Sequence, residues 1–475
     1  MKKIGILCVA LVLVLALVIP SAAYAKNCPQ PPPYVRPIIF AHGYSGSALQ
    51  FESQALRFAS NGWPANYLFA FEWTTGVSHP PETTEERTAR LDAFADSVLE
   101  ETGADKVYLM GHSAGTGVSF TYLAEPERAA KVAKYVNIDG ITSDALPGGV
   151  PTLAIWAELD GEGNPRPPRE IVGATNVLLP GQYHVQAATS PEAFAAMYEF
   201  FTDKPPLTTD ILPEPPGLVR LAGRAVLFPA NIGVGDATIE IWEVDGDTGF
   251  RKHDEPEATY TLSGSGYYDG AWGPFKANGR KYYEIVLLRE GYRPHHFYFE
   301  PFIRSDYLIR LNASAHGGVG DYLDRSPNHS NLVVTRDKEL RSDPGEVNDI
   351  LELNGDNVLQ AVTPITKSLV GLFVYDYHAD RVSDLTQPTW LHMLPFLTGI
   401  DLYMPAADPP DGSISVMLTP RDGDGKTQVV NVPNWTSSED TMSVRFRDYL
   451  QEFNSWREYI IYLVRTRLEH IFRHI

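Results

Sequence analysis

The chain has 475 residues, more than a single hydrophobic core usually serves, so two or three domains are expected. Hydrophobic residues make up 44% of it, as in globular proteins, and long disordered arms are therefore not predicted. The formal net charge of -20 repels phosphate-rich polymers at long range, which excludes nucleic acid as a partner.

The N-terminus has the pattern of a secretory signal peptide over residues 1–25. Lys2 and Lys3 precede an apolar run over 4–20, and Ala25 ends a small-residue cleavage signature. We therefore expect a secreted protein whose mature chain begins near Lys26. An uncleaved membrane anchor is the alternative, although the run is slightly short for a membrane span.

Residues 26–203 alternate strand-like and helix-like stretches. Helices are predicted over 84–102, with Gly103 as a stop, and from Ser190, a cap residue followed by proline. The predicted strands are 37–41, 67–73, 106–110, 134–138, 151–156 and 176–179. This alternation predicts an α/β domain whose mostly parallel sheet is covered by helices on both faces.

The pattern changes after residue 203. A proline-rich segment over 204–217 is expected to be a semi-rigid linker. Short strands among Gly, Pro, Asp and Asn turns then predict one or two β-sandwich or barrel modules, over 218–315 and 316–452. The last stretch, 453–475, is predicted to be a helix that either docks on the protein or lies on a lipid surface.

A candidate nucleophile lies in the pentapeptide Gly111-His112-Ser113-Ala114-Gly115. A G-x-S-x-G segment between a strand and a helix holds its serine on a sharp turn at the carboxyl edge of the sheet. Here the segment directly follows the strand over 106–110 and precedes a helix-compatible stretch over 116–123. Ser113 is therefore the expected nucleophile.

A serine nucleophile needs a base, an orienting acid and donors for the oxyanion. His184 is the candidate base, because it follows the strand over 176–179 on a loop at the same sheet edge. Asp139 and Asp160 each end a neighbouring strand, and both fit the chain order Ser, Asp, His; generic topology favours Asp160. The expected oxyanion donors are the backbone N–H groups of Tyr44 and Ala114.

Other histidines fit these roles less well. His42 belongs to the oxyanion loop, and His112 is expected to point away from the serine. His295 and His296 lie in the β-rich region, where surface or packing roles are expected.

Several of these segments together resemble secreted bacterial and archaeal lipases of the α/β-hydrolase superfamily, the Archaeoglobus type in particular. The segments that carry the resemblance are 42–46, 50–54, 111–115, 137–140, 174–177, 184–186, 189–192, 208–211 and, more loosely, 295–298. The resemblance implies an α/β-hydrolase domain followed by a β-rich lipid-binding domain. It also implies that Asp139 is the acid, leaving Asp160 as the alternative. No cofactor or metal is expected, because the Asp-Gly turns at Asp245/Asp247 and Asp422/Asp424 lack the remaining spacing of a calcium loop.

One interval departs from those lipases, which have a long helical lid where this chain has only residues 74–84, with Pro80 and Pro81. The sequence thus predicts an open, lidless site in a lipase that cleaves acylglycerol esters. A short-chain esterase or an extracellular polyester depolymerase is the alternative, and a binding or adhesion protein on a hydrolase scaffold is a further one. The expected partners are the ester substrate and, through the C-terminal domain, a lipid surface; the oligomeric state is left open.

Overall fold

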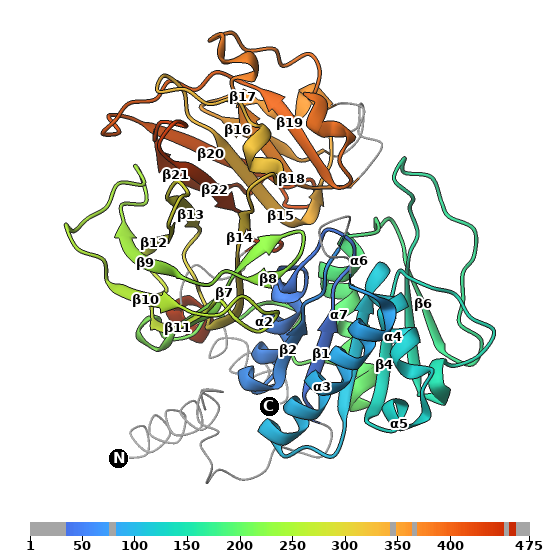
Figure 1. Ribbon diagram of the computed structural model, residues 1–475. Coiled ribbons are helices and arrows are strands. Elements are labelled where there is room, and N and C mark those ends of the chain that lie inside the picture. Colours follow the sequence, from blue (N-terminus) through green and yellow to red (C-terminus); the bar gives the residue numbers. More distant parts are fainter. Residues whose placement is uncertain (1–34, 76–81, 343–347, 363–367, 451–455, 462–475) are drawn as a thin grey trace, which may run out of the picture.

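The computed structural model describes residues 35–75, 82–342, 348–362, 368–450 and 456–461 (Figure 1). The expected signal peptide, both prolines of the short lid interval and most of the expected C-terminal helix lie outside these ranges. Residues 456–461 are helical. Within the described residues, no helix combines the length and the apolar character that crossing a membrane requires.

A six-stranded parallel sheet forms the centre of the first domain, in the order β2-β1-β3-β4-β5-β6. The strands are β1 (Ile38–Ala41), β2 (Leu68–Phe71), β3 (Val107–His112), β4 (Val132–Ile138), β5 (Thr152–Ala157) and β6 (Thr175–Leu179). All six strands were predicted, with every end within two residues of its observed position. Because the strands are parallel, the loops that follow β3, β4 and β6 meet at one edge.

Helices cover both faces of this sheet. The helices are α2 (Glu52–Ser60), α3 (Thr84–Thr102), α4 (Ala114–Leu123), α5 (Pro126–Ala129), α6 (Gln186–Thr189) and α7 (Pro191–Thr202). Alternate strand residues enter different cores: Ile38 packs with residues of α2 and α7, whereas Ile39 packs with residues of α3 and α4. Helix α3 has the predicted bounds, because Thr83 and Glu86 form a capping box and Gly103 ends it at a φ of 67°.

The second half of the chain contains three sheets rich in antiparallel strands. The longest has the order β10 (Ala258–Leu262), β9 (Ala237–Val244), β12 (Tyr282–Arg289), β13 (His295–Phe299), β22 (Thr441–Arg445), β15 (Leu332–Leu340), β18 (Leu369–Tyr375) and β19 (Leu397–Asp401). A second contains β11 (Ala271–Lys276), β7 (Arg220–Phe228) and β14 (Asp306–Ser314), with β8 (Ile232–Gly233) on β7. The third contains β17 (Asp356–Asn357), β16 (Ile350–Leu353), β20 (Ser413–Thr419) and β21 (Gln428–Pro433).

These sheets form two β-sandwiches that share the long sheet. Each sandwich has its own core. One core lies between the β7 sheet and strands β9 and β12, and the other lies between the β20 sheet and strands β15 and β18. The two halves join where β13 pairs in parallel with β22. The expected modules over 218–315 and 316–452 are therefore not separate in space, because backbone hydrogen bonds continue from one into the other.

The proline-rich segment over 204–217 is packed against the first domain instead of spanning a gap. The Oδ1 atom of Asn61 accepts a hydrogen bond from Leu207 N at 2.7 Å. Ile211 is buried between Leu56 of α2 and Ile303 of the β-rich half. As a result, the β-rich half lies directly beside the α/β domain (Figure 1).

Candidate active site

The turn between β3 and α4 presents Ser113 at the carboxyl edge of the sheet. The serine has a φ of 52° and a ψ of -122°, a conformation that costs a non-glycine residue backbone strain. The flanking glycines make room for this turn: a Cβ on Gly115 would lie 2.1 Å from the carbonyl oxygen of Ala41, and one on Gly111 would lie 2.8 Å from that of Gly115. The pentapeptide therefore forms the sharp strand-to-helix turn that the sequence predicts.

His184 connects Ser113 to Asp139. Its Nε2 atom lies 2.8 Å from the serine Oγ, and its Nδ1 atom lies 2.5 Å from Oδ2 of Asp139. Asp160 is not in this chain of hydrogen bonds: its exposed carboxylate accepts the backbone N–H groups of Glu162 and Asn164, each at 2.9 Å, and so closes a local turn. The structure thus brings together Ser113, His184 and Asp139.

Two arginines and a backbone amide also bind the Asp139 carboxylate, whose side chain is fully buried. Arg169 Nη2 donates to Oδ1 at 2.6 Å, Arg166 Nη1 donates to Oδ2 at 3.0 Å, and Ala157 N donates to Oδ1 at 2.8 Å. Burial opposes ionisation, but the hydrogen bond and charge of His184 and the two guanidinium groups outweigh it. The pKa of Asp139 therefore lies well below its ordinary value. No pattern in the sequence indicates a role for either arginine.

The structure corrects the expectation for His112, which does not point away from the site. Its ring lies 4.7 Å from that of His184, and its Nε2 atom lies 3.0 Å from the His184 carbonyl oxygen. Burial, reinforced by the charge of His184, lowers the pKa of His112 to about 3. His112 is thus a neutral support beneath the loop that carries His184.

The loop after β1 places Tyr44 at the rim of the pocket that contains Ser113. Hydrogen bonds hold the loop on both sides of Tyr44: Gly43 N donates to Gln50 Oε1 at 2.8 Å, and Ser45 N donates to Thr75 Oγ1 at 3.1 Å. Ala114 begins α4, so its N–H is among the helix-terminal amides that have no acceptor within the helix. His42, in the same loop, is fully buried against Glu72, at 3.2 Å.

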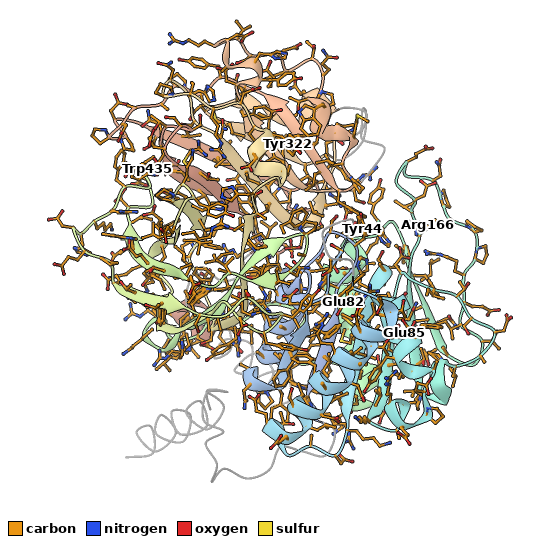
Figure 2. The ribbon with its side chains drawn as sticks, viewed as in Figure 1. Tyr44, Glu82, Glu85, Arg166, Tyr322 and Trp435 are labelled. Carbon is orange, nitrogen blue, oxygen red and sulfur yellow. The ribbon has the colours of Figure 1, made fainter. Side chains whose placement is uncertain are left out.

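The β-rich half supplies part of the pocket wall. Asp337, Val370 and Phe396 line the pocket together with Ser113 and His184. The ring of Phe396 lies 6.5 Å from that of Tyr44, which faces the β-rich half in Figure 2. These contributions lie more than 140 residues after His184 in the chain, and no local pattern identifies them.

The β-rich half also holds the loops around the histidine in place. The Arg341 guanidinium lies 3.7 Å above the ring of Tyr183, the residue that precedes His184. The same guanidinium donates to the carbonyl oxygen of Gly161 at 2.9 Å. Through these contacts one side chain connects the second β-sandwich to both loops that bear on the Asp139–His184 pair.

A larger apolar cavity begins beside the pocket. Ser45, Asp337 and Val370 line both spaces, so the two are neighbours. The larger cavity has a volume of about 120 Å³. Its apolar lining includes Phe228, Phe297, Val319, Leu323, Phe373 and Leu397.

For His295 and His296, the sequence led us to expect either a surface or a packing role. Both side chains are buried, so the packing role is the correct one. His296 connects two parts of the β-rich half: Nδ1 lies 2.5 Å from Glu284 Oε1, and Nε2 lies 2.9 Å from Asp440 Oδ1. Neither histidine reaches the Ser113 pocket.

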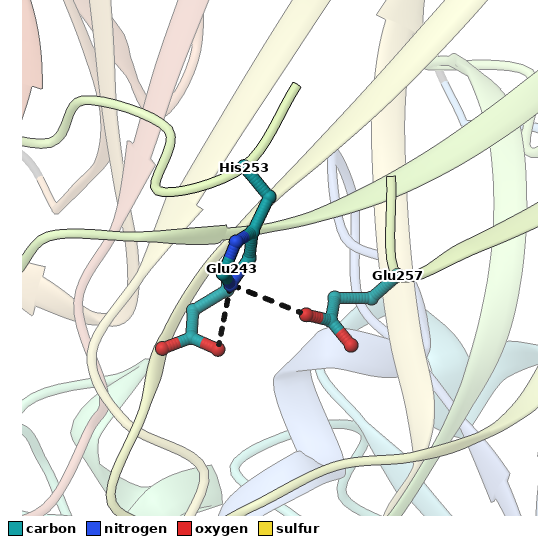
Figure 3. A group of neighbouring side chains, drawn as sticks. All are labelled: Glu243, His253 and Glu257. Carbon is teal, nitrogen blue, oxygen red and sulfur yellow. Dashed lines mark ion pairs between the residues drawn. The ribbon is translucent and has the colours of Figure 1, made fainter. Parts of the chain in front are cut away.

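One group in the described part of the chain has the spacing of metal ligands. Potential ligand atoms of Glu243, His253 and Glu257 lie within 4.8 Å of one another (Figure 3). However, two ammonium groups already pair with Glu243: that of Lys281, and that of Lys252 at 3.7 Å. Glu243 is buried and already paired with these cations, whereas His253 and Glu257 are exposed, so the group forms an ion-pair network.

Comparisons with known proteins agree with this architecture. The family model of the alpha/beta hydrolase fold matches residues 36–174, the lipase C-terminal domain matches 217–316, and a further C-terminal domain model matches 318–450. One similar solved structure is that of a metagenome-derived lipolytic enzyme, from work on the enzymes LipS and LipT. It is 16% identical, the match covers 35% of this chain and 93% of that chain, and the TM-score is 0.27. Another is a thermophilic esterase from Thermogutta terrifontis, which is 15% identical; the match covers 35% of this chain and 90% of that chain, with a TM-score of 0.28. By these family models, residues 36–174 have the alpha/beta hydrolase fold and residues 217–316 match the lipase C-terminal domain.

Proposed function

We propose that this protein is a secreted serine hydrolase of carboxylic esters that acts as a lipase on acylglycerols. The observation that supports it most directly is the chain of two hydrogen bonds from Ser113 through His184 to Asp139, at the edge of the sheet where three loops meet. Secretion rests on the pattern of residues 1–25.

Each member of the chain has a role in the proposed reaction. His184 Nε2 takes the hydroxyl proton as Ser113 Oγ attacks the ester carbonyl carbon, and Asp139 stabilises the imidazolium that forms. The backbone N–H groups of Tyr44 and Ala114 donate to the oxyanion. His184 then gives the proton to the departing alcohol, and a water molecule releases the acid from the acyl-enzyme by the same steps in reverse order.

The apolar cavity favours a substrate with a long acyl chain over one with a short acyl chain. A chain leaving the Ser113 pocket past Val370 would enter a space lined by aromatic and aliphatic side chains. Each methylene removed from water contributes about 0.8 kcal/mol. On this proposal the β-rich half binds the substrate's acyl chain, and short esters would leave most of that free energy unused.

Covalent labelling tests the nucleophile. A fluorophosphonate probe should label the wild-type protein and should not label S113A. The matched control is S97A, which changes an exposed serine on α3, on the catalytic domain but outside the pocket. Unlabelled wild-type protein in its folded state would leave only the binding or adhesion alternative.

A second test concerns the substrate class. V370W narrows the passage between pocket and cavity, and V370A serves as its size control. We expect V370W to lower kcat/KM on triolein at least about tenfold more than on tributyrin, since one blocked pocket contact typically contributes 1–3 kcal/mol. Equal losses on both esters would contradict the proposed path, and a preference for an insoluble polyester over triolein would favour the depolymerase.

A further inference from the structure

The backbone N–H of Tyr44 lies in a tight turn whose conformation is strained. Gly46 N donates to the Gly43 carbonyl oxygen at 3.2 Å, which closes a four-residue turn with Tyr44 and Ser45 at its centre. Ser45 has a φ of 56°, in the left-handed region that a residue with a side chain rarely adopts. Such a conformation persists only where the surrounding structure holds it in place. The direction of the Tyr44 N–H therefore depends on the contacts that restrain this turn.

One restraint comes from the β-rich half, at the turn over 229–231 between β7 and β8. Asn231 of this turn is fully buried. Its Nδ2 atom donates to the Gly46 carbonyl oxygen at 2.8 Å and to the Trp73 carbonyl oxygen at 3.1 Å. The asparagine side chain thus connects the last residue of the Tyr44 turn to the segment that follows β2.

A second restraint is the hydroxyl of Thr75, which the same β-rich turn binds. Ser45 N donates to Thr75 Oγ1 at 3.1 Å, and Oγ1 in turn donates to the Pro229 carbonyl oxygen at 3.2 Å. The Thr75 backbone N–H donates to that carbonyl oxygen as well, at 3.1 Å. The two residues that follow Tyr44 are therefore both held, directly or through one hydroxyl, by the turn over 229–231.

The chain just after the Tyr44 turn is also anchored on the β-rich half. Ala48 N donates to Glu72 Oε1 at 3.2 Å, and Arg310 Nε of β14 donates to the same oxygen at 2.6 Å. The side chains of Glu72 and Arg310 are both buried. The loop between β1 and α2 is thus fixed against the sheet that contains β7 and β14.

We infer that Asn231 and Thr75 are positioning residues, through which the β-rich half holds the Tyr44 backbone N–H in place for the oxyanion. The inference rests on the proposed serine hydrolase function, and it gives the β-rich half a role in the chemical step besides binding the acyl chain. A donor that meets the oxyanion acts in the transition state and not on the bound ester. Its displacement therefore lowers kcat and leaves KM nearly unchanged.

The experiment measures kcat and KM on a soluble butyrate ester for N231G, T75V and T75S. Asn231 has a φ of 56°, which glycine tolerates, so N231G removes the amide without adding backbone strain. We expect N231G and T75V each to lower kcat at least about tenfold, because a misplacement of about 1 Å can cost about 100-fold and loss of a donor about 100- to 1000-fold. KM should stay within about threefold of wild type, and T75S, which keeps the hydroxyl, should also keep kcat within about threefold.

Two changes of the same kind away from the pocket are the controls. N354G matches N231G, because Asn354 in the second sandwich also has a positive φ, of 51°, and its Oδ1 atom accepts the Ser415 N–H at 2.9 Å. T88V matches T75V, because it removes a buried hydroxyl from α3. Both controls should keep kcat within about threefold of wild type, even where the urea midpoint falls.

An alkyl trifluoromethyl ketone inhibitor tests the same N–H without turnover. Ser113 Oγ adds to its carbonyl carbon, His184 Nε2 takes the hydroxyl proton, and the carbonyl oxygen becomes an oxyanion. The inhibition constant should rise in N231G and T75V by about the factor by which kcat/KM falls, and it should not rise in T75S or in the controls. A merely structural role would change the urea midpoint and leave this constant unchanged.

The possible results separate the inference from the proposed function. A kcat within about threefold of wild type in N231G or in T75V, while S113A abolishes activity, overturns the inference and leaves the proposed function intact. Equal losses of kcat in T75V and T75S also overturn it, since the hydroxyl would then have no special part. Wild-type activity that survives S113A contradicts the proposed function itself. If N231G is insoluble, the comparison of T75V with T75S decides.

Discussion

Replacing Asp139 by asparagine tests the acid assignment most directly. The carboxylate accepts hydrogen bonds from the His184 ring, from two guanidinium groups and from the Ala157 amide. An asparagine keeps one acceptor oxygen, but its NH₂ group faces some of these donors and its charge is zero. The imidazole is then no longer held in the required tautomer, and its charged form loses its counter-charge. Loss of these two effects lowers kcat about 10⁴-fold in a serine protease triad, or about 5.5 kcal/mol in the barrier.

D160N is the matched control, because it makes the same chemical change on the neighbouring strand's loop. Asp160 is exposed and accepts two backbone N–H groups, which an asparagine oxygen still accepts. We expect D160N to keep kcat within about threefold of wild type, as surface changes usually cost little. Initial rates on a butyrate ester, with folding checked by circular dichroism, make the comparison. A larger loss in D160N than in D139N would refute the assignment of Asp139.

Two further changes test the turn and the β-rich half. G115A should give insoluble or inactive protein, because the added Cβ would lie 2.1 Å from the Ala41 carbonyl oxygen; a soluble variant with wild-type rates would contradict the close approach of α4 to β1. Burial opposes the charge of His296, but the hydrogen bonds that its ring donates to Asp440 and Glu284 outweigh burial, so the pKa of His296 is raised. The contribution of charged His296 to the free energy of unfolding is therefore fully present below about pH 6.5, and it is lost as the pH rises through the raised pKa. The urea midpoint of the wild-type protein should therefore be lower at pH 8 than at pH 6, and this difference should be smaller in H296Q. The same difference in both proteins would contradict this role of His296.

The parts of the site that could be predicted from sequence depend on local chemistry. The turn at Ser113 needs small residues two positions away on each side, and those positions are visible in the pentapeptide itself. His184 and Asp139 follow strands whose apolar runs are plain, and parallel strands bring their loops to one edge. The choice between Asp139 and Asp160 could not be made from local chemistry, because each aspartate follows one of two adjacent strands. The resemblance to secreted lipases implied Asp139, and in the structure it is the carboxylate of Asp139 that contacts the imidazole.

Helix α2 shows why other parts escaped prediction. Its polar residues are buried together with its apolar ones, from Glu52 to Ala59, so its polar face is not a solvent-exposed face. Gln54 Nε2 donates to the Ala188 carbonyl oxygen at 2.9 Å, and Arg57 Nη1 donates to that of Thr189 at 2.6 Å. The acceptors belong to the segment after His184, so the helix is specified by partners far away in the chain. Hydrophobic periodicity predicts a helix with one solvent-exposed face, and this helix has no such face.

The β-rich half contributes to the site, and the sequence of neither half alone indicates this contribution. The Arg445 guanidinium hydrogen-bonds Glu52 of α2 in a buried contact and Asp337 of the second sandwich in a partly buried one. Removing one member of such a group leaves an uncompensated buried charge, which typically costs about 3–5 kcal/mol. Because Asp337 also lines the Ser113 pocket, the contact that holds the halves together shapes the pocket wall as well. The two halves therefore cannot separate without opening the site, and the Ser113 pocket of this chain requires both.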